Sequence, residues 1–365
     1  MAGIEQLGVN AFRRRLVAGS FPVYPDLDAA LAGLQFVQAD PIRCPARAQD
    51  LMLRQRVAAY LAGDLEARFP EMSAEEGYLF AYGIMTPELW RSVRGGGRAK
   101  LDKLERAVLD AVGEWGEAHP RDLDERFGTA SVRNYWGGKS KASKRVLEDL
   151  HDAGLLRVCR REKGVRVYQV PPASDASELS PRERYRSLLL ATAHVFGPTS
   201  ARFLISELGY HRSLLAARRE RLEVLDGLRE EGILQELVVE GVSYVWIRDE
   251  WMNEEVPERA RILAPFDPLV RNRERFEQVW GWTYRFEAYV PAAKRERGYY
   301  AMPLLWKDRV LGWANAKVEA GHLKVALGYV GKRPREKAFR LAVENEVEAL
   351  AKFLGLGSGA WELAF

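Results

Sequence analysis

Apolar residues recur in the same arrangement in two separate parts of the chain. The segments Leu147–Leu156 and Leu225–Leu234 each place two leucines three residues apart, a glycine four residues later, and then two further apolar residues. This spacing predicts an amphipathic helix that ends at a left-handed glycine and continues into a strand. An alternating segment follows each one and predicts a β-hairpin: Val158–Val170, turning near Lys163-Gly164, and Glu236–Ile247, turning near Glu240-Gly241.

Further helices are predicted before each of these segments. The helical spacing of apolar residues covers Asp102–Trp115, a short stretch beginning at His119-Pro120, Arg182–Val195 and Ser200–Leu208. Helices followed by a glycine-capped helix and a two-stranded ribbon correspond to the winged-helix plan, here in two copies. A third, degenerate copy is predicted at Leu31–Asp40, where Gln38 takes the place of the capping glycine and Asp40 falls on the second residue of the following strand.

The last third of the chain has a different pattern. Strands are predicted at Tyr284–Val290, Tyr299–Trp306, Val310–Val318 and Leu323–Tyr329, and an amphipathic helix at Arg335–Leu354. Lys307-Asp308 would form the tip of a hairpin. This part is therefore expected to be a small antiparallel sheet or barrel with one helix covering an opening.

Composition indicates an ordinary globular protein. Of the 365 residues, 47% are hydrophobic and 29% charged. A chain of this length is long enough for about two to four domains. No apolar run approaches the ~20 residues of a membrane span, and the N-terminus lacks a signal-peptide core. The two cysteines lie far apart in sequence, so a reducing cytoplasm is expected. Cys44 and Cys159 form no CxxC motif and the five histidines are scattered, which argues against a disulfide framework or a His-built metal site.

The positive charge is concentrated in the middle of the chain. The net charge is +4, yet residues 91–170 hold 18 Lys and Arg against 12 Asp and Glu. A basic region on a nearly neutral protein favours a polyanionic partner without identifying it.

Gln38-Ala39-Asp40, followed by Pro41, is the candidate for chemistry. Proline disfavours the α-conformation in the residue before it, so Asp40 is expected to be extended. In an extended strand, residues i and i+2 project from the same face about 6.5–7 Å apart. An amide and a carboxylate would then point together from a buried edge, where they can hold and activate a water molecule. The alternative interpretation is a strand end with two solvated polar residues.

Five segments carry a resemblance to a known family: Phe36–Ile42, Trp136–Leu150, Leu263–Leu269, Tyr284–Arg295 and Gly298–Tyr300. Together they resemble the AlkZ/YcaQ family of winged-helix DNA glycosylases. The resemblance implies an α+β fold of three tandem winged-helix units in a C shape, followed by a small C-terminal antiparallel β-barrel. The corresponding domains are residues 1–95, 96–172, 173–252 and 253–365.

The resemblance also implies an activity. The family cleaves the N-glycosidic bond of alkylated purines, and some members unhook interstrand crosslinks. Its catalytic element, Gln-hydrophobic-Gln or Gln-hydrophobic-Asp, matches Gln38-Ala39-Asp40. Asp40 would be the general base and the counter-charge to an oxocarbenium-like transition state, and Gln38 would orient the water. No metal or cofactor is implied. Without a second carboxylate, the paired-acid arrangement of sugar hydrolases is not supported, and without a lysine placed for Schiff-base chemistry we expect a monofunctional enzyme.

Contacts with double-stranded DNA containing alkylated purines are expected from several groups of residues. The candidates are Arg43 and Arg47 beside the lesion; Trp136, Lys139, Lys141, Lys144 and Arg145 at the second unit's recognition helix; Lys294, Arg297 and Tyr299; and Lys307 and Arg309 at a hairpin that can probe a minor groove. For each cation the alternative is a solvated surface, and for the tyrosine a place in the barrel core.

Other classes of protein stay open. Winged helices also occur in transcription regulators, which bind DNA without chemistry and usually dimerise. No heptad run is present, so a monomer without an obligate protein partner or membrane association is expected, in the cytoplasm and associated with a bacterial nucleoid. A catalytically weakened relative that binds damaged DNA is the remaining alternative.

Overall fold

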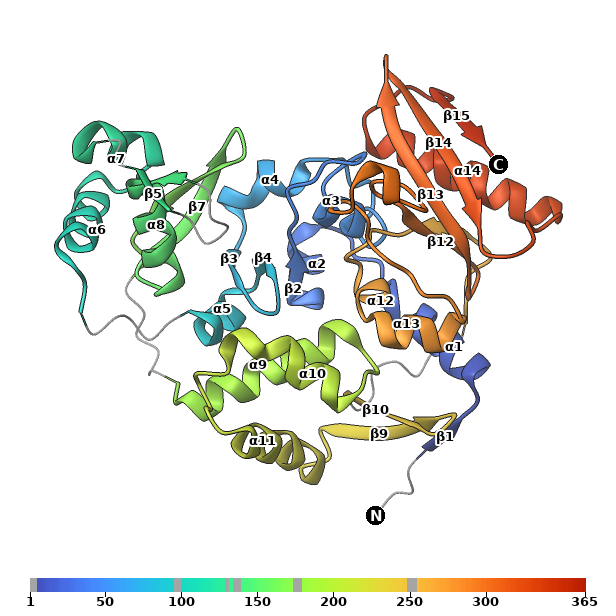
Figure 1. The fold of residues 1–365 in the computed structure, drawn as a ribbon, viewed down its shortest axis with the longest axis horizontal. Coiled ribbons are helices and arrows are strands. Elements are labelled where there is room, and N and C mark those ends of the chain that lie inside the picture. The colour runs from blue at the N-terminus through green and yellow to red at the C-terminus, as the bar shows by residue number, and fades with distance from the viewer. Residues whose placement is uncertain (1–4, 95–99, 129–130, 134–138, 173–178, 248–254) are drawn as a thin grey trace.

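The computed structural model describes residues 5–94, 100–128, 131–133, 139–172, 179–247 and 255–365, and for 131–133 and 139–141 it describes the backbone alone. Two lobes lie at opposite ends of the long axis, with residues 20–93 between them (Figure 1). One lobe is formed by residues 100–172 and the other by the C-terminal sheet. Residues 179–247 lie along one side of the central part.

The N-terminal part folds around a three-stranded sheet of order β2-β4-β3. Its elements are β1 (Glu5–Leu7), α1 (Val9–Ser20), α2 (Leu27–Leu34), β2 (Phe36–Gln38), α3 (Ala48–Leu53), α4 (Asp64–Arg68), η1 (Phe69–Glu71), β3 (Glu75–Tyr78), β4 (Tyr82–Met85) and α5 (Pro87–Val93). The alignment of Gln38 with a capping glycine was wrong. Helix α2 already ends at Leu34, and the residue after it, Gln35, has a positive φ of 59°. Gln38 is therefore the last residue of a strand.

The two following segments have the predicted order of helices and hairpin. The first contains α6 (Lys103–Trp115), α7 (Pro120–Phe127), β5 (Ser131–Arg133), β6 (Lys139–Lys141), α8 (Ala142–Asp152), β7 (Arg157–Glu162) and β8 (Val165–Gln169). The second contains α9 (Pro181–Phe196), α10 (Ala201–Glu207), η2 (Leu208–His211), α11 (Arg218–Glu230), β9 (Leu234–Val239) and β10 (Val242–Ile247). Both predicted hairpin turns are confirmed, with positive φ at Lys163-Gly164 and at Glu240-Gly241. Strand β1 adds to the second hairpin, parallel to β9.

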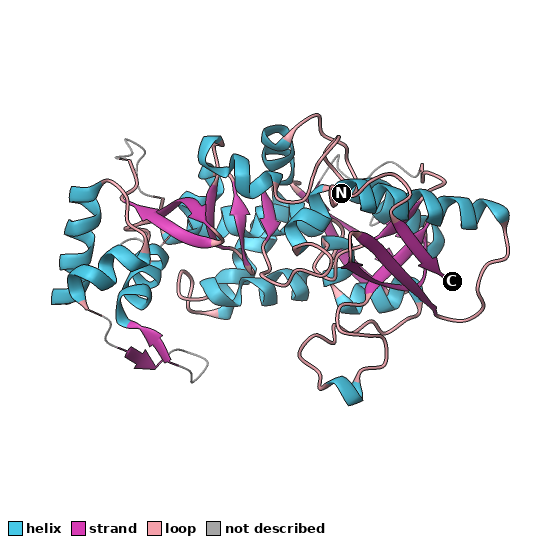
Figure 2. Ribbon diagram, turned by 90° about the horizontal axis from the view of Figure 1, so that it is seen from above, coloured by secondary structure: helices cyan, strands magenta, loops and turns pink. Residues whose placement is uncertain are grey.

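The C-terminal part is a curled five-stranded sheet, a half-barrel whose large strands lie beside the C-terminus in Figure 2. Its elements are β11 (Ala260–Ile262), α12 (Pro268–Arg271), α13 (Arg273–Trp280), η3 (Ala292–Lys294), β12 (Met302–Trp306), β13 (Arg309–Glu319), β14 (His322–Tyr329), α14 (Lys337–Phe353) and β15 (Trp361–Ala364). The hairpin at Lys307-Asp308 and the covering helix are confirmed.

The C-terminal sheet differs in two respects from the antiparallel β-barrel that the resemblance implied. Strand β15 pairs in parallel with β14, and β11 and β15 remain the edges of the sheet. Helix α14 contacts both edge strands and packs buried side chains, among them Phe339 and Val347, across the open side. Because the helix fills this space, the edges have no partner strand to close on.

The strand predicted at 284–290 was also wrong, because this segment is a loop. Its aromatic residues pack against other side chains without pairing with a strand: Phe286 lies against Phe266 and Tyr300, with ring centroids 5.0 and 5.3 Å away. Tyr284 is buried beside Phe276 and Trp282, with ring centroids 5.8 and 5.6 Å away, and its hydroxyl donates to the carbonyl of Ala301 at 2.6 Å.

The buried side chains form cores that join distant parts of the chain. One core contains residues of the N-terminal part, of the 103–168 segment and of the half-barrel; a second joins residues 36–90 to 185–245; a third joins α1 to the β9–β10 hairpin, α12 and α13. The central residues 31–90 therefore contribute to two cores at once. Within the described ranges, no helix is long and apolar enough to cross a membrane.

Candidate active site

Strand β2 positions Gln38 at the end of a closely packed pair of strands. Gln38 lies opposite Gly83 of β4, and a Cβ at position 83 would come within 2.5 Å of the Phe36 ring and of the Val37 carbonyl oxygen. Only glycine therefore permits this approach of the two strands. The last backbone contact is the bond from the Ala39 N–H to the Tyr82 carbonyl at 2.9 Å, and the chain turns away after it.

The side chain of Gln38 is held by an arginine from the C-terminal part. Gln38 is 8% exposed, and its Oε1 accepts a hydrogen bond from Arg271 at 3.1 Å. Because a guanidinium only donates, it fixes which end of the amide it meets. Arg271 also pairs with Glu207 at 2.7 Å and lies 5.0 Å over the ring of Phe80. The NH₂ group of Gln38 has no hydrogen-bond partner among the described residues and remains available to a ligand.

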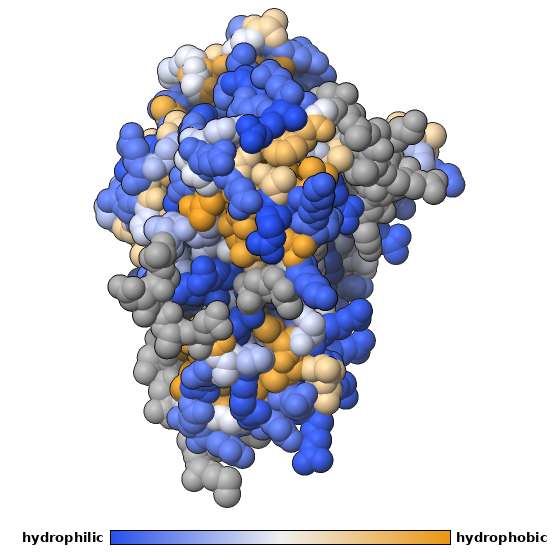
Figure 3. Space-filling model, turned by 90° about the vertical axis from the view of Figure 1, so that its left-hand side faces the viewer, coloured by the Kyte–Doolittle hydropathy of each residue, from blue (hydrophilic) through white to orange (hydrophobic). Residues whose placement is uncertain are grey.

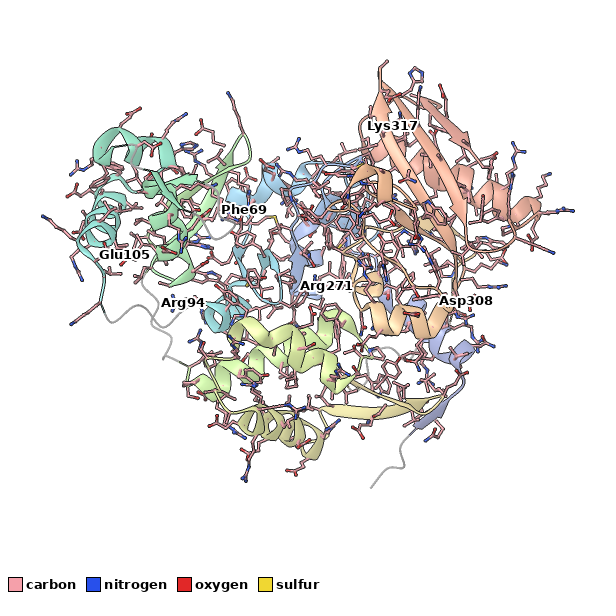
Figure 4. The ribbon with its side chains drawn as sticks, in the orientation of Figure 1. Phe69, Arg94, Glu105, Arg271, Asp308 and Lys317 are labelled. Carbon is pink, nitrogen blue, oxygen red and sulfur yellow. The ribbon has the colours of Figure 1, made fainter. Side chains whose placement is uncertain are left out.

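A buried ion pair places the short helix that carries Arg271. Asp267 caps α12 by accepting from the Leu269 N–H at 3.1 Å, and its carboxylate receives two bonds from Arg56, at 2.8 and 3.1 Å. The two side chains are 3% and 1% exposed. Figure 4 labels Arg271 where α12, α10 and the central sheet meet. The position of the Gln38 amide thus depends on an ion pair whose two members lie 211 residues apart in sequence.

Asp40 is half-buried just beyond the strand. Its Oδ1 accepts from the Ile42 N–H at 2.9 Å, and its own N–H donates to the side chain of Gln49 at 3.1 Å. Burial raises the pKa of the Asp40 carboxyl, and the bond from Ile42 offsets part of this effect. A carboxylate with a raised pKa is a stronger base than a solvated one, which is the property that general-base catalysis requires.

Gln38 and Asp40 line separate cavities, so the predicted shared face was wrong. Gln38 lies on a cavity of about 270 Å³, whereas Asp40 lies on another of about 260 Å³. Side chains alternate between the two faces of a sheet only within the strand. Strand β2 ends at Gln38, and the bond between Asp40 and Ile42 turns the next residues out of the extended course.

The Asp40 cavity contains several other charged groups, each with a partner inside the protein. Glu76 is bound by Arg161 at 2.5 Å and approached by Arg166 at 3.5 Å, and Tyr82 donates to it at 2.7 Å. Burial alone would raise the pKa of Glu76, but these groups outweigh it and lower the pKa. Both arginines come from the β7–β8 hairpin. This hairpin therefore forms one wall of the cavity on which Asp40 lies.

Further carboxylates in this cavity were missed by the sequence reasoning. Asp50 accepts from the Tyr60 hydroxyl at 2.6 Å and from the Gly63 N–H at 3.2 Å, and Glu66 pairs with Arg47. Burial raises the pKa of Asp50, against the opposing effect of Tyr60. Asp50, Glu66 and Glu76 each bind a side chain. Among the described carboxylates of this cavity, that of Asp40 differs because it accepts only a backbone N–H.

Tyr300 is a buried neighbour of the Asp40 loop. It precedes Met302, which pairs with Ala314 of β13, and the carbonyl of Ala316, two residues along β13, meets the Cys44 thiol at 3.6 Å. The Tyr300 side chain is 1% exposed, and its hydroxyl has no partner among the described residues. Burial is the main cause that raises the pKa of this phenol, and the negative charge of Asp40 raises the pKa further. The hydroxyl therefore stays protonated close to Asp40.

The predicted DNA contacts are distributed over several surfaces. Arg43, Lys294 and Arg309 are exposed. Arg47 is engaged by Glu66 inside the Asp40 cavity. Lys144 and Arg145 lie on α8, at the end of the molecule seen in Figure 3, where hydrophilic residues surround smaller apolar groups. They form pairs within the helix, with Glu148 at 3.9 Å and Asp149 at 3.1 Å.

Of three further predicted contacts, Arg297 and Lys307 are engaged inside the protein and Tyr299 is exposed. Arg297 is turned inward, between the rings of Trp282 and Trp313, and 3.9 Å from Glu287. Tyr299 is 42% exposed, with Arg295 5.0 Å over its ring. Lys307 pairs with Glu258.

The hairpin tip at Lys307-Asp308 lies away from the Asp40 cavity. The carbonyl of Asp308 accepts from Trp280 of α13 at 2.9 Å. Figure 4 places Asp308 far from Phe69, which lines that cavity. Trp136 lies outside the described residues, as do the side chains of Lys139 and Lys141.

Most of the residues that hold the site were not found from the sequence. Arg271, Glu207, Arg56 and Gln49 carry no local signal, because each acts on a partner far along the chain or in another element. Asp267 did carry a local sequence signal, since an aspartate directly before a proline is typical of a helix N-cap. Within the described residues, no three His, Cys, Asp or Glu side chains lie together as a metal site would require.

The chain is similar to proteins of a known class in both sequence and fold. Residues 31–353 match the family described as DNA glycosylase AlkZ-like, and the chain belongs to this family. Among solved structures it is similar to the DNA glycosylase AlkZ of Streptomyces sahachiroi, with a TM-score of 0.66, 16% sequence identity, and 98% of each chain covered. The family assignment indicates a DNA glycosylase, and the structural likeness supports the mixed α+β fold.

Proposed function

We propose that this protein is a monofunctional DNA glycosylase that hydrolyses the N-glycosidic bond of purines alkylated at N7 or N3, in double-stranded DNA. The observation that carries the proposal is Asp40: a half-buried carboxylate with a raised pKa, fixed by Gln49 and Ile42 on a cavity of about 260 Å³. Membership of a DNA glycosylase family supports the reaction class.

The chemistry suits these residues. An alkylated purine with a positive charge is already a good leaving group, so the enzyme needs chiefly to stabilise the cation that develops on the sugar and to deliver water. Asp40 serves as counter-charge to that cation and takes a proton from the attacking water. Proton transfer of this kind contributes about 10²–10⁴ in rate. The chain's own residues suffice for these steps, and the account assigns no cofactor.

The DNA-binding surface is part of the same proposal. Three winged-helix units, the third being the degenerate N-terminal one, would hold the duplex, with Arg43, Lys294 and Arg309 at phosphates, where their exposure leaves them accessible. The basic residues of α8 would add contacts after exchanging their helix partners for phosphates. Interstrand crosslinks are further candidate substrates of the same chemistry.

The test is release of free 7-methylguanine from a duplex oligonucleotide carrying one such base, with the unmodified duplex as control. We expect free base and abasic sites that break only after alkali treatment, since hydrolysis leaves the strand intact. Strand breaks without alkali would contradict a monofunctional enzyme. Retained binding of the alkylated duplex without release of this or a bulkier alkylated base would favour a damage-binding protein, and dimeric binding to a palindrome would favour a regulator.

A further inference from the structure

The separation of Gln38 and Asp40 leaves open which residue orients the water that Asp40 activates. Gln38 lies on one cavity and Asp40 on the other. A carboxylate can accept a proton from a water molecule, but it does not by itself fix the direction of the lone pairs on the water oxygen. A second polar group on the Asp40 cavity is therefore needed to aim the water at the sugar carbon.

Gln49 is a polar side chain on this cavity, and it is bonded to Asp40 itself. It lies in the first turn of α3 and is 8% exposed, and its Oε1 accepts from the Asp40 N–H at 3.1 Å. Since a backbone N–H only donates, this bond identifies the oxygen end of the amide. The other end is then an NH₂ donor, which has no hydrogen-bond partner among the described residues.

The amide of Gln49 is neutral, unlike most polar groups around it. The other groups are paired within the protein: Arg47 with Glu66, Arg161 and Arg166 with Glu76, Tyr82 with Glu76, and Tyr60 with Asp50. An arginine free to bind Asp40 would lower the pKa of its carboxyl, which burial raises. Gln49 does not titrate, so it offers a donor without weakening Asp40 as a base or neutralising its charge.

We propose that Gln49 is the residue that orients the hydrolytic water at Asp40. This inference rests on the proposed function and gives Gln49 the role that the sequence suggested for Gln38. The NH₂ group of Gln49 donates to one lone pair of the water oxygen, and Asp40 takes one of the water's two protons. The other lone pair forms the bond to the sugar carbon. The N-glycosidic bond breaks, and its electron pair passes to the alkylated purine, which loses its positive charge.

Gln49→Glu separates the two ends of the side chain. Ionised glutamate keeps an oxygen for the Asp40 N–H and has no donor. Its negative charge also favours the cation that develops on the sugar, so a slower reaction cannot come from lost charge stabilisation. Gln49→Met keeps the length of the side chain and removes both polar ends. Gln6→Glu makes the same chemical change at an exposed position of β1 and is the matched control.

The test measures single-turnover release of 7-methylguanine from the alkylated duplex against pH, with duplex binding and thermal unfolding of each variant. Repulsion between the two carboxylates of Gln49→Glu raises both pKa values, so rates are compared where each pH profile is level. We expect Gln49→Glu to bind the duplex as the wild type does and to release base about tenfold more slowly, which is the order of one neutral hydrogen bond. A folded Gln49→Met should be slowed at least as much, and Gln6→Glu should be unaffected.

A level rate of Gln49→Glu equal to or above that of the wild type would overturn the inference, even with a slow Gln49→Met. The side chain would then act only through its bond to the Asp40 backbone. Release at the wild-type rate by a folded Gln49→Met would overturn it as well. Failure of the proposed function has a different signature, because the wild type itself would release no base, and the inference would fall with it.

Discussion

The buried pair between Arg56 and Asp267 offers a quantitative test of how the site is held. Asp267→Asn keeps the size of the side chain and its ability to cap α12, because asparagine caps as well as aspartate. It removes the negative charge that Arg56 meets at 2.8 and 3.1 Å. With both side chains at most 3% exposed, the guanidinium is left as an uncompensated buried charge, and breaking such a pair costs about 3–5 kcal/mol.

A matched control is available within the same chain. Arg68 and Asp28 form a pair at 3.1 Å whose side chains are 46% and 53% exposed, so Asp28→Asn makes the same chemical change in water. Surface pairs contribute about 0–1 kcal/mol. Both variants are unfolded in urea, followed by circular dichroism and by tryptophan fluorescence, and coincident transitions are required before free energies are compared. A loss below about 1 kcal/mol in Asp267→Asn, equal to that of Asp28→Asn, would refute the reasoning.

Three other perturbations test separate parts of the account. Tyr300→Phe removes a buried hydroxyl without a partner, so we expect unchanged or higher stability in urea; a loss above about 1 kcal/mol would show that the hydroxyl is bonded. Gly83→Ala places a methyl within 2.5 Å of Phe36 and Val37, and we expect a cost of about 1–3 kcal/mol together with slower base release; a neutral effect on unfolding would contradict the packing of β2 on β4. The base must be ionised, and burial raises the pKa of Asp40, so the single-turnover rate should rise with pH through that raised pKa and then level; a rate that falls at no acidic pH at which the protein stays folded would exclude Asp40 as the base.

The sequence predicted the parts of the fold that depend on local patterns. The glycine-capped helices and both hairpins of residues 100–247 follow from apolar spacing and from turn residues that take positive φ. The choice between an open sheet and a barrel could not be made in this way, because whether β11 and β15 meet depends on how α14 fills the space between them. The apparent strand at 284–290 arose because Tyr284 packs on α13 and Phe286 on Phe266 and Tyr300, which imitates the alternation of a strand.

The candidate site was predicted in its residues and not in its geometry. Gln38 and Asp40 were found from two polar positions in an apolar run, but their divergence into two cavities depends on where β2 ends, which a hydrogen bond to Tyr82 decides. The bond from Arg271 joins residues 233 positions apart. Contacts of this kind are made by tertiary packing, and no periodicity along the chain reports them.

The most direct test of the central claim compares single-turnover release of 7-methylguanine from duplex DNA by the wild type and by Asp40→Asn. Asparagine still accepts the Ile42 N–H, so the loop should keep its shape. Because burial raises the folded-state pKa of Asp40, its ionisation costs stability as the pH rises through that pKa, and the variant should be at least as stable near neutrality. Asp110→Asn, on the exposed face of α6, is the matched control.

The account predicts that Asp40→Asn binds the duplex as the wild type does but releases base about 10²–10⁴ times more slowly, while Asp110→Asn is unaffected. Release by Asp40→Asn at the wild-type rate would contradict the claim that this carboxylate performs the chemistry.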